Sequence, residues 1–259
     1  MPRKPREHSE SGVYHVMLRG INRQDIFLDE EDNLRFLETV YRYKVKSKLQ
    51  VLAWCILSNH VHLLIKEGCE AIHQTIKRIA VSYTQYYRWK YNYVGHLFQD
   101  RFKSEIVESD GYLFTVTRYI HQNPIKAGVV KRMDEWKWSS CNGYYGKVTY
   151  PGGLLDMGLI LAVISENKDA AIKQFKAFNE ENTVDACLDF TDRNRLSDEE
   201  AKIKIENSMG GVSISDIRIL PKLEKEKVIN TAKALDGITH KQIARLLGVS
   251  SRTIFESGK

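Results

Sequence analysis

The pattern of hydrophobic and polar positions predicts alternating strands and helices in the first half of the chain. Short runs dense in apolar residues and bounded by turn residues indicate strands, and we expect them at 13–19, 49–57, 60–66 and within 95–107. Apolar residues at helical spacing indicate helices, which we expect at 30–43, 71–91 and 110–122. The last helix is expected to end before Pro124, because the residue preceding a proline disfavours helical backbone.

The order of these elements predicts an α+β fold. Strand, helix, strand, strand, helix, strand is the split βαβ arrangement, an antiparallel sheet with helices packed on it. Ser58-Asn59 is the expected tight turn of a hairpin. In this arrangement the strand at 60–66 is central.

The pattern changes after a boundary that is rich in glycine. Gly146, Pro151, Gly152 and Gly153 mark this boundary, and the residues beyond it turn helical and charged. We expect two helices within 159–179, a polar loop at 182–197 and helices again from residue 223 to the end.

Residues 238–254 have the spacing of a helix-turn-helix. Thr239 and Ser250 are the expected helix N-caps, Gly248 permits the turn, and Ala244 is small where two helices must cross. A plain helical hairpin is the alternative. In a helix-turn-helix the major groove of duplex DNA would be contacted by Ser251, Arg252 and Thr253. We therefore expect three parts: a domain at 1–150, a helical connector at 151–196 and an all-α DNA-binding module at 197–259.

The amino-acid composition narrows the possible functions only slightly. The formal net charge of +6 is compatible with a polyanionic partner such as nucleic acid. The four cysteines form no CxxC pair, so neither a zinc ribbon nor a disulfide framework is indicated. No signal peptide or apolar run of membrane-spanning length is present, so we expect a cytoplasmic protein without a membrane partner.

The candidate chemistry lies on the central strand and on the helix at 110–122. His60 and His62 are separated by one residue, point to the same side of a strand and can hold one divalent metal. Tyr119 carries a hydroxyl that can attack phosphorus. Asn123, four positions later, could supply a third metal ligand, with Gln122 as the alternative. The histidine pair alone is a weak signal, since such patterns occur by chance.

Four sequence blocks resemble the single-tyrosine HUH transposases. Asn59-His60-Val61-His62-Leu63-Leu64 looks like their histidine–hydrophobic–histidine motif. Further blocks of the same family are similar to residues 14–23, 95–103 and 119–128, in the right order. The branch that the chain resembles most is IS200-like and is associated with repetitive extragenic palindromes.

The resemblance implies a fold, an activity and a site. The fold would be a ferredoxin-like sheet, and the substrate would be single-stranded DNA, a hairpin with flanking bases. His60, His62 and Asn123 would hold Mg²⁺ or Mn²⁺, and Tyr119 would form a 5′-phosphotyrosine. Family members often carry a glutamine where Asn123 stands. The protein would act as a monomer or a homodimer, with duplex DNA as a second partner of the C-terminal module.

Several basic residues are candidates for phosphate contacts. A solvated surface position is the alternative for each of them. The candidates are Arg19, Arg23, Arg101, Lys103, Arg118 and Lys126. Arg101 and Lys103 alternate on the expected fourth strand, so they would share a face.

Three functions are compatible with this sequence. The first is a metal-dependent transposase that cleaves and transfers single-stranded DNA. The second is a non-catalytic DNA-binding regulator built on the same fold. The third and weaker one is an RNA-processing nuclease in which Tyr119 is idle. The presence of His60, His62, Tyr119 and Asn123 together favours the first.

Overall fold

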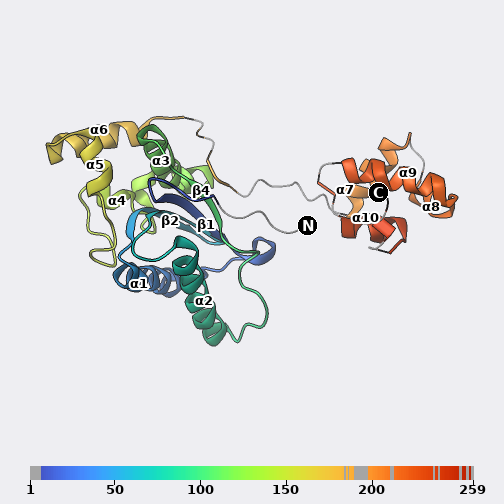
Figure 1. The fold of residues 1–259 in the computed structure, drawn as a ribbon, viewed down its shortest axis with the longest axis horizontal. Coiled ribbons are helices and arrows are strands. Elements are labelled where there is room, and N and C mark those ends of the chain that lie inside the picture. The colour runs from blue at the N-terminus through green and yellow to red at the C-terminus, as the bar shows by residue number, and fades with distance from the viewer. Residues whose placement is uncertain are drawn as a thin grey trace. The chain divides into compact units, whose positions relative to one another are not determined.

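The chain forms two compact units, Met1–Asp189 and Phe190–Lys259, in a computed structural model. The structure describes residues 7–183, 185, 187–189, 198–210, 213–235, 237–238, 240–250, 253–254 and 257. Figure 1 shows the two units with their helices and strands.

The first unit is built on a four-stranded antiparallel sheet with the order β2-β3-β1-β4. The strands are β1 (Val13–Arg19), β2 (Gln50–Leu57), β3 (His60–Lys66) and β4 (Lys103–Ile106). The order confirms the split βαβ prediction and places β3 inside the sheet. β2 and β3 form the expected hairpin.

Helices cover both faces of the sheet (Figure 1). One face carries α1 (Glu30–Ser47) and α2 (Ile72–Tyr91), and the other carries α3 (Asp110–Lys126), α5 (Gly158–Ile164) and α6 (Lys168–Glu180). Strand β3 divides its side chains between these faces, because successive residues of a strand point to opposite sides. Val61, Leu63 and Ile65 join the core under α1 and α2, whereas Leu64 joins the core under α3. His60 and His62 share the side of Leu64.

Helix α3 does not end before Pro124, so that expectation is wrong. The helix runs from Asp110 through Pro124 to Lys126, and Ala127 donates its backbone N–H to the Asn123 carbonyl oxygen, 2.9 Å away. Proline removes one helical hydrogen bond, but here it lies in the last turn, beside the buried Gln122 and Asn123. The continued helix places Asn123 one turn beyond Tyr119.

Helices α5 and α6, which follow residue 150, pack into the first unit. Phe175 of α6 is fully buried and stacks on Tyr144 of α4 (Cys141–Tyr144), with ring centroids 4.4 Å apart. His121 of α3 is also fully buried, and its ring nitrogens lie 3.1 Å from Asn179 Oδ1 and 2.8 Å from Ser140 Oγ. These contacts fix α3 in place above the sheet. The expectation of two helices within 159–179 is confirmed, because α5 ends at Ile164 and Asn167 caps α6.

The second unit is helical and has its own hydrophobic core. Its helices are α7 (Asp198–Ser208), α8 (Ile214–Ile219), α9 (Lys222–Ala234) and α10 (His240–Leu247). Gly248 has a positive φ of 66°, and Ser250 Oγ accepts a hydrogen bond from the backbone N–H of Thr253, 3.0 Å away. Ala244 is buried. The predicted turn and second cap are therefore present, while Thr239, Ser251 and Arg252 lie outside the described residues.

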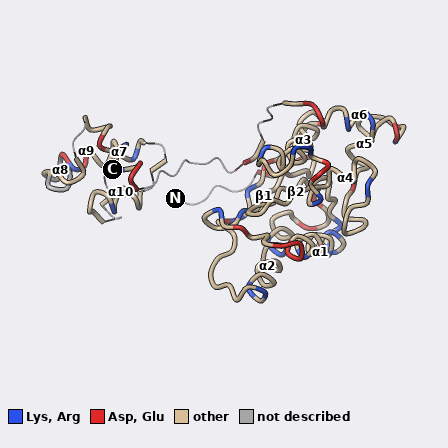
Figure 2. Tube along the Cα trace, turned by 180° about the vertical axis from the view of Figure 1, so that it is seen from behind, with Lys and Arg blue, Asp and Glu red and all other residues tan. Residues whose placement is uncertain are grey.

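Charges of both signs are distributed along the chain, and α1 begins with a run of acidic residues (Figure 2). In the described part of the chain, no helix combines the length and the apolar character that a membrane span needs.

Candidate active site

The predicted histidines and tyrosine meet between β3 and α3. The ring centroids of His60 and His62 are 5.1 Å apart, and those of His62 and Tyr119 are 5.7 Å apart. The histidines share one face of β3 because they are two positions apart, and α3 packs on that face. The fold thus brings together side chains that are nearly sixty residues apart in sequence.

Each histidine has a hydrogen-bond partner for its Nδ1 atom. His60 Nδ1 lies 2.6 Å from Asn59 Oδ1, and His62 Nδ1 lies 2.9 Å from His15 Nε2. An amide oxygen only accepts, so His60 Nδ1 carries the proton and His60 Nε2 keeps a lone pair. His62 is fully buried, and its Nε2 has no hydrogen-bond partner.

Both histidines are neutral at pH 7. Burial lowers the pKa of His60 to about 4, with a further lowering by the charge of Arg19, against which Asp189 acts in the opposite direction. Burial also holds the pKa of His62 well below its ordinary value, helped by the neighbouring histidines and cations. Neutral imidazoles have the lone pairs that metal coordination requires.

Tyr119 is 5% exposed, and its hydroxyl is held by a carboxylate. The hydroxyl donates a hydrogen bond to Asp189 Oδ2, 3.1 Å away, and Lys126 Nζ lies 4.3 Å from the ring centroid. Burial raises the pKa of Tyr119, and the negative charge of Asp189 raises it further, while Asn123 lowers it by hydrogen bonding. The free protein therefore holds Tyr119 as a neutral phenol.

Asn123 and Gln122, the two candidates for the third ligand, have different surroundings. Asn123 Nδ2 donates to the Tyr119 carbonyl oxygen, 2.9 Å away, and the Asn123 amide acts on the Tyr119 pKa. Gln122 Nε2 instead donates to the carbonyl oxygens of Asn179 and Glu181, at the end of α6. Asn123 is thus the carboxamide that lies next to the tyrosine.

Three of the predicted phosphate contacts lie around the site. Arg19 of β1 lies opposite His60 of the neighbouring strand β3, and its charge lowers the pKa of His60. Lys103 Nζ donates to the backbone oxygen of Asp189, 3.3 Å away. Lys126 lies against Tyr119. The three cations thus lie beside His60, Asp189 and Tyr119, respectively.

The other basic candidates are placed differently. Arg118 is buried and pairs with Glu181 and Asp185, at 2.9 Å and 2.8 Å. Arg23 is exposed, and its backbone oxygen accepts a hydrogen bond from the side chain of Asn59 in the hairpin turn. The expectation that Arg101 and Lys103 share a strand is wrong, because β4 begins at Lys103 and Arg101 lies in the preceding bend. In the second unit, Thr253 is exposed.

Three residues near the site were not singled out by the sequence. His15 of β1 is fully buried between His62 and Glu105 of β4, and Asp189 contacts Tyr119. The signal for His15 was its position in the first strand of a sheet that carries two more histidines. No sequence signal marked Asp189, which follows a polar stretch without periodicity.

The residues present fit a metal ion in part. Among the described residues, no group of three or more histidine, cysteine, aspartate or glutamate side chains is arranged to hold a metal. The predicted set, however, consists of two histidines and one asparagine. The buried His62 Nε2 atom without a partner is the kind of group that a bound ion would satisfy. Imidazole and amide oxygen are both known ligands of divalent cations.

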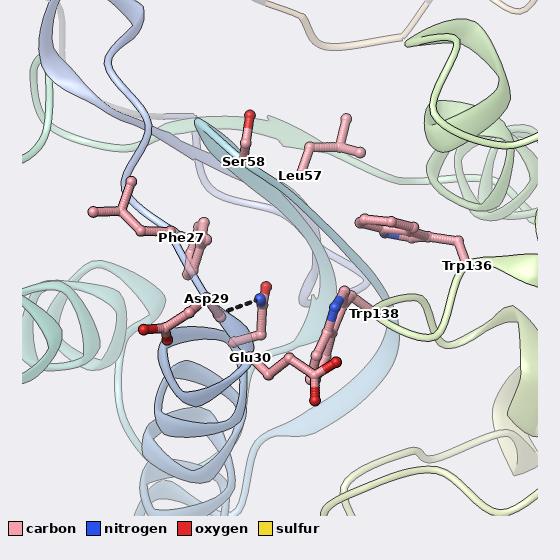
Figure 3. Close-up of a pocket in the computed structure, with 9 residues that line it drawn as sticks. Phe27, Asp29, Glu30, Leu57, Ser58, Trp136 and Trp138 are labelled. Atoms are coloured by element: carbon pink, nitrogen blue, oxygen red, sulfur yellow. Dashed lines mark hydrogen bonds between the residues drawn. The ribbon is translucent and has the colours of Figure 1, made fainter.

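A separate pocket of about 250 Å³ lies between the start of α1 and the end of β2 (Figure 3). Its walls include Phe27, Leu57, Trp136 and Trp138, with Asp29 at one side. Neither the two histidines of β3 nor Tyr119 lines it.

The first unit is similar in sequence to known transposases. Residues 8–123 match the family described as Transposase IS200 like. A protein of Haemophilus influenzae described as a REP-associated tyrosine transposase is 26% identical over 160 residues, which cover 56% of this chain and 89% of that protein. Residues 8–123 are thus similar to the IS200-like transposases.

Two solved structures are similar to this chain. One is a REP-associated tyrosine transposase bound to a REP hairpin, with a TM-score of 0.49, 20% identity and coverage of 60% of this chain and 94% of that one. The other is a transposase of Deinococcus radiodurans, with a TM-score of 0.33, 17% identity and coverage of 47% and 97%.

The contact between Asp189 and Tyr119 can be tested by titration. In Asp189→Asn we expect the pKa of Tyr119 to fall, because the carboxamide carries no negative charge to oppose formation of the phenolate. The measurement is ¹³C NMR of protein labelled at tyrosine Cζ, followed against pH. Asp169→Asn, an exposed change in the first turn of α6, is the control. A Tyr119 pKa that is equal in wild type and Asp189→Asn contradicts the contact.

Proposed function

We propose that this protein is a metal-dependent endonuclease and strand transferase that acts on single-stranded hairpin DNA. The observation that carries the proposal is the convergence of Tyr119 with His60 and His62, with rings 5.7 Å apart for His62 and Tyr119. A phosphodiester-cleaving site needs a nucleophile beside groups that neutralise the phosphate. The match of residues 8–123 to the IS200-like transposase family agrees with this chemistry.

In the proposed reaction, Tyr119 attacks the scissile phosphorus. A bond forms between the phenol oxygen and phosphorus as the bond between phosphorus and the 3′ oxygen breaks. The phenol loses its proton, and the departing 3′ oxygen gains one, which leaves a 5′-phosphotyrosine and a 3′ hydroxyl. Attack by a 3′ hydroxyl of another strand end reverses the step and releases Tyr119. The covalent bond conserves the energy of the phosphodiester, so joining needs no nucleotide cofactor.

His60, His62 and Asn123 are the residues that would hold the ion, Mg²⁺ or Mn²⁺. A bound divalent ion would supply positive charge to the phosphate oxygens. The two imidazoles are neutral and the His62 Nε2 atom lacks a partner, which supports their assignment as ligands. Asn123 is preferred to Gln122, because the Gln122 amide is bonded to the end of α6.

Cations around Tyr119 support a polyanionic substrate. Arg19, Lys103 and Lys126 lie about the tyrosine and can contact the DNA backbone. Asp189 has the opposite charge and holds the Tyr119 hydroxyl in the free protein. We infer that Asp189 moves away from Tyr119 when a phosphate enters, since two anions at such a distance repel each other.

The decisive experiment uses labelled single-stranded hairpin DNA incubated with the full chain and Mn²⁺. A covalent protein–DNA adduct should be seen on a denaturing gel and should be lost in Tyr119→Phe, because phenylalanine has no nucleophilic oxygen. Tyr112→Phe is the matched control, since Tyr112 lies two turns earlier on the same helix. It should retain the adduct.

Two results would contradict the proposal. An adduct that persists in Tyr119→Phe would show that another residue is the nucleophile. Tight binding of hairpin DNA without any adduct, over a range of metals and sequences, would favour a non-catalytic DNA-binding regulator built on the same fold.

For the second unit we propose binding to duplex DNA through the helix-turn-helix at 238–254, in which Ser251, Arg252 and Thr253 would contact the major groove. The turn at Gly248 and the cap at Ser250 support this assignment. This module would add affinity for duplex DNA next to the cleaved strand, with the domain at 1–150 as the catalytic part and 151–196 as the connector.

The duplex-binding role is tested by Arg252→Ala in the full chain. We expect the affinity for duplex DNA to fall several-fold while cleavage of single-stranded hairpin DNA is unchanged, as measured by fluorescence anisotropy and the adduct assay. Lys227→Ala removes the same charge from an exposed position of α9 and is the control. Equal duplex affinity in both variants contradicts the assignment of Arg252.

A further inference from the structure

A chain of polar groups crosses three neighbouring strands behind the candidate active site. His15 of β1 lies between His62 of β3 and Glu105 of β4. His15 Nε2 is 2.9 Å from His62 Nδ1, and His15 Nδ1 is 4.0 Å from Glu105 Oε2. The register accounts for this order, because His15 faces Glu105 directly and is two residues from Met17, the partner of His62.

Neither histidine of this chain is charged. Both are fully buried, where a charge without a hydrogen-bonded partner of opposite sign is costly. A neutral imidazole carries one N–H and one lone pair. The short contact between His15 and His62 therefore contains a single proton, and two arrangements of the protons are possible.

In the first arrangement, His62 Nδ1–H donates to His15 Nε2. His15 then carries its own proton on Nδ1, directed toward the carboxylate of Glu105, and His62 Nε2 has a lone pair. In the second, His15 Nε2–H donates to His62 Nδ1. The lone pair of His15 Nδ1 then faces a carboxylate, and His62 Nε2–H is a buried donor without a partner.

The surroundings favour the first arrangement. A carboxylate attracts an N–H and repels a lone pair at 4.0 Å, and His15 is fully buried although the Glu105 side chain is partly exposed. Glu105 is held in place by the backbone N–H of Leu188, which donates to Glu105 Oε2 at 3.0 Å. Each arrangement leaves one buried N–H without a hydrogen bond, that of His15 Nδ1 in the first and that of His62 Nε2 in the second. Only in the first arrangement does this N–H face a carboxylate, and the His62 Nε2 lone pair is then free to accept a metal ion.

We propose that His15 is a positioning residue that, with Glu105 behind it, holds His62 in the tautomer protonated on Nδ1 and so keeps the His62 Nε2 lone pair available for a metal ion. The inference rests on the proposed function, in which His62 is a metal ligand. We expect His15 itself to contact neither DNA nor the metal ion. Partners of this kind, which orient a ligand through its second ring nitrogen, are typical of histidine metal sites.

The tautomer can be measured directly on the metal-free full chain. Long-range ¹H–¹⁵N correlation spectra of protein labelled with ¹⁵N-histidine distinguish Nδ1–H from Nε2–H rings, and His62→Gln identifies the His62 signals. We expect His62 to be protonated on Nδ1 in the wild type. In His15→Leu, which removes the acceptor, we expect a shift toward the Nε2–H form.

Metal affinity gives a second measurement. Titration with Mn²⁺, followed by the EPR signal of the free ion, should show affinity 10-fold to 100-fold weaker in His15→Leu than in the wild type. His15→Gln places an amide oxygen near the former Nε2 position and should restore affinity to within a few-fold. Glu105→Gln should weaken affinity less than His15→Leu. His121→Leu, which removes another fully buried histidine, is the control and should leave the His62 tautomer unchanged.

The outcomes separate this inference from the proposed function. A wild-type His62 protonated on Nε2 overturns the inference, and so does a His15→Leu protein that keeps both the Nδ1–H tautomer and full Mn²⁺ affinity. If His15→Leu does not fold, the wild-type tautomer and the Mn²⁺ titration of His15→Gln still test the role of His15. If the wild type forms no adduct with DNA, the proposed function fails, while the tautomer of His62 continues to decide the role of His15.

Discussion

The packing of α3 against the face of β3 that carries His60 and His62 is the constraint on which the site depends. This contact buries the two imidazoles, keeps them neutral and places the ring of Tyr119 beside His62. Burial alone would leave polar nitrogens unsatisfied, and the neighbouring Asn59 and His15 satisfy one nitrogen of each ring. The same packing therefore buries His62 while its Nε2 atom has no hydrogen-bond partner.

Helix α3 is held by elements on its far side as well. His121 is bonded to Asn179 and Ser140, Gln122 is bonded to the end of α6, and Arg118 pairs with Glu181 and Asp185. The side chains that flank Tyr119 in sequence are thus used to anchor the helix, which leaves Tyr119 and Asn123 directed to the site. Arg118, which precedes Tyr119 in sequence, anchors the helix, and the cations near the site come from β1, β4 and the end of α3.

The strands and the histidine pair could be predicted from the sequence because they depend on local patterns. Dense apolar runs and a two-residue turn define β2 and β3, and the spacing of His60 and His62 fixes their common face. Asp189 could not be predicted, because its contact with Tyr119 spans 70 residues and its surroundings have no periodicity. The role of His15 depends on strand register, and the helix through Pro124 depends on packing that offsets a lost hydrogen bond.

The central claim is that His60, His62 and Tyr119 surround one metal-assisted phosphate site. Its most direct test is pulsed EPR of Mn²⁺ bound to the full chain, with ¹⁴N and ¹⁵N histidine labelling to count the coordinated imidazoles. We expect two histidine nitrogens in the wild type and one in either His60→Ala or His62→Ala. Mn²⁺ bound without any histidine nitrogen, or a spectrum unchanged by both substitutions, would contradict it.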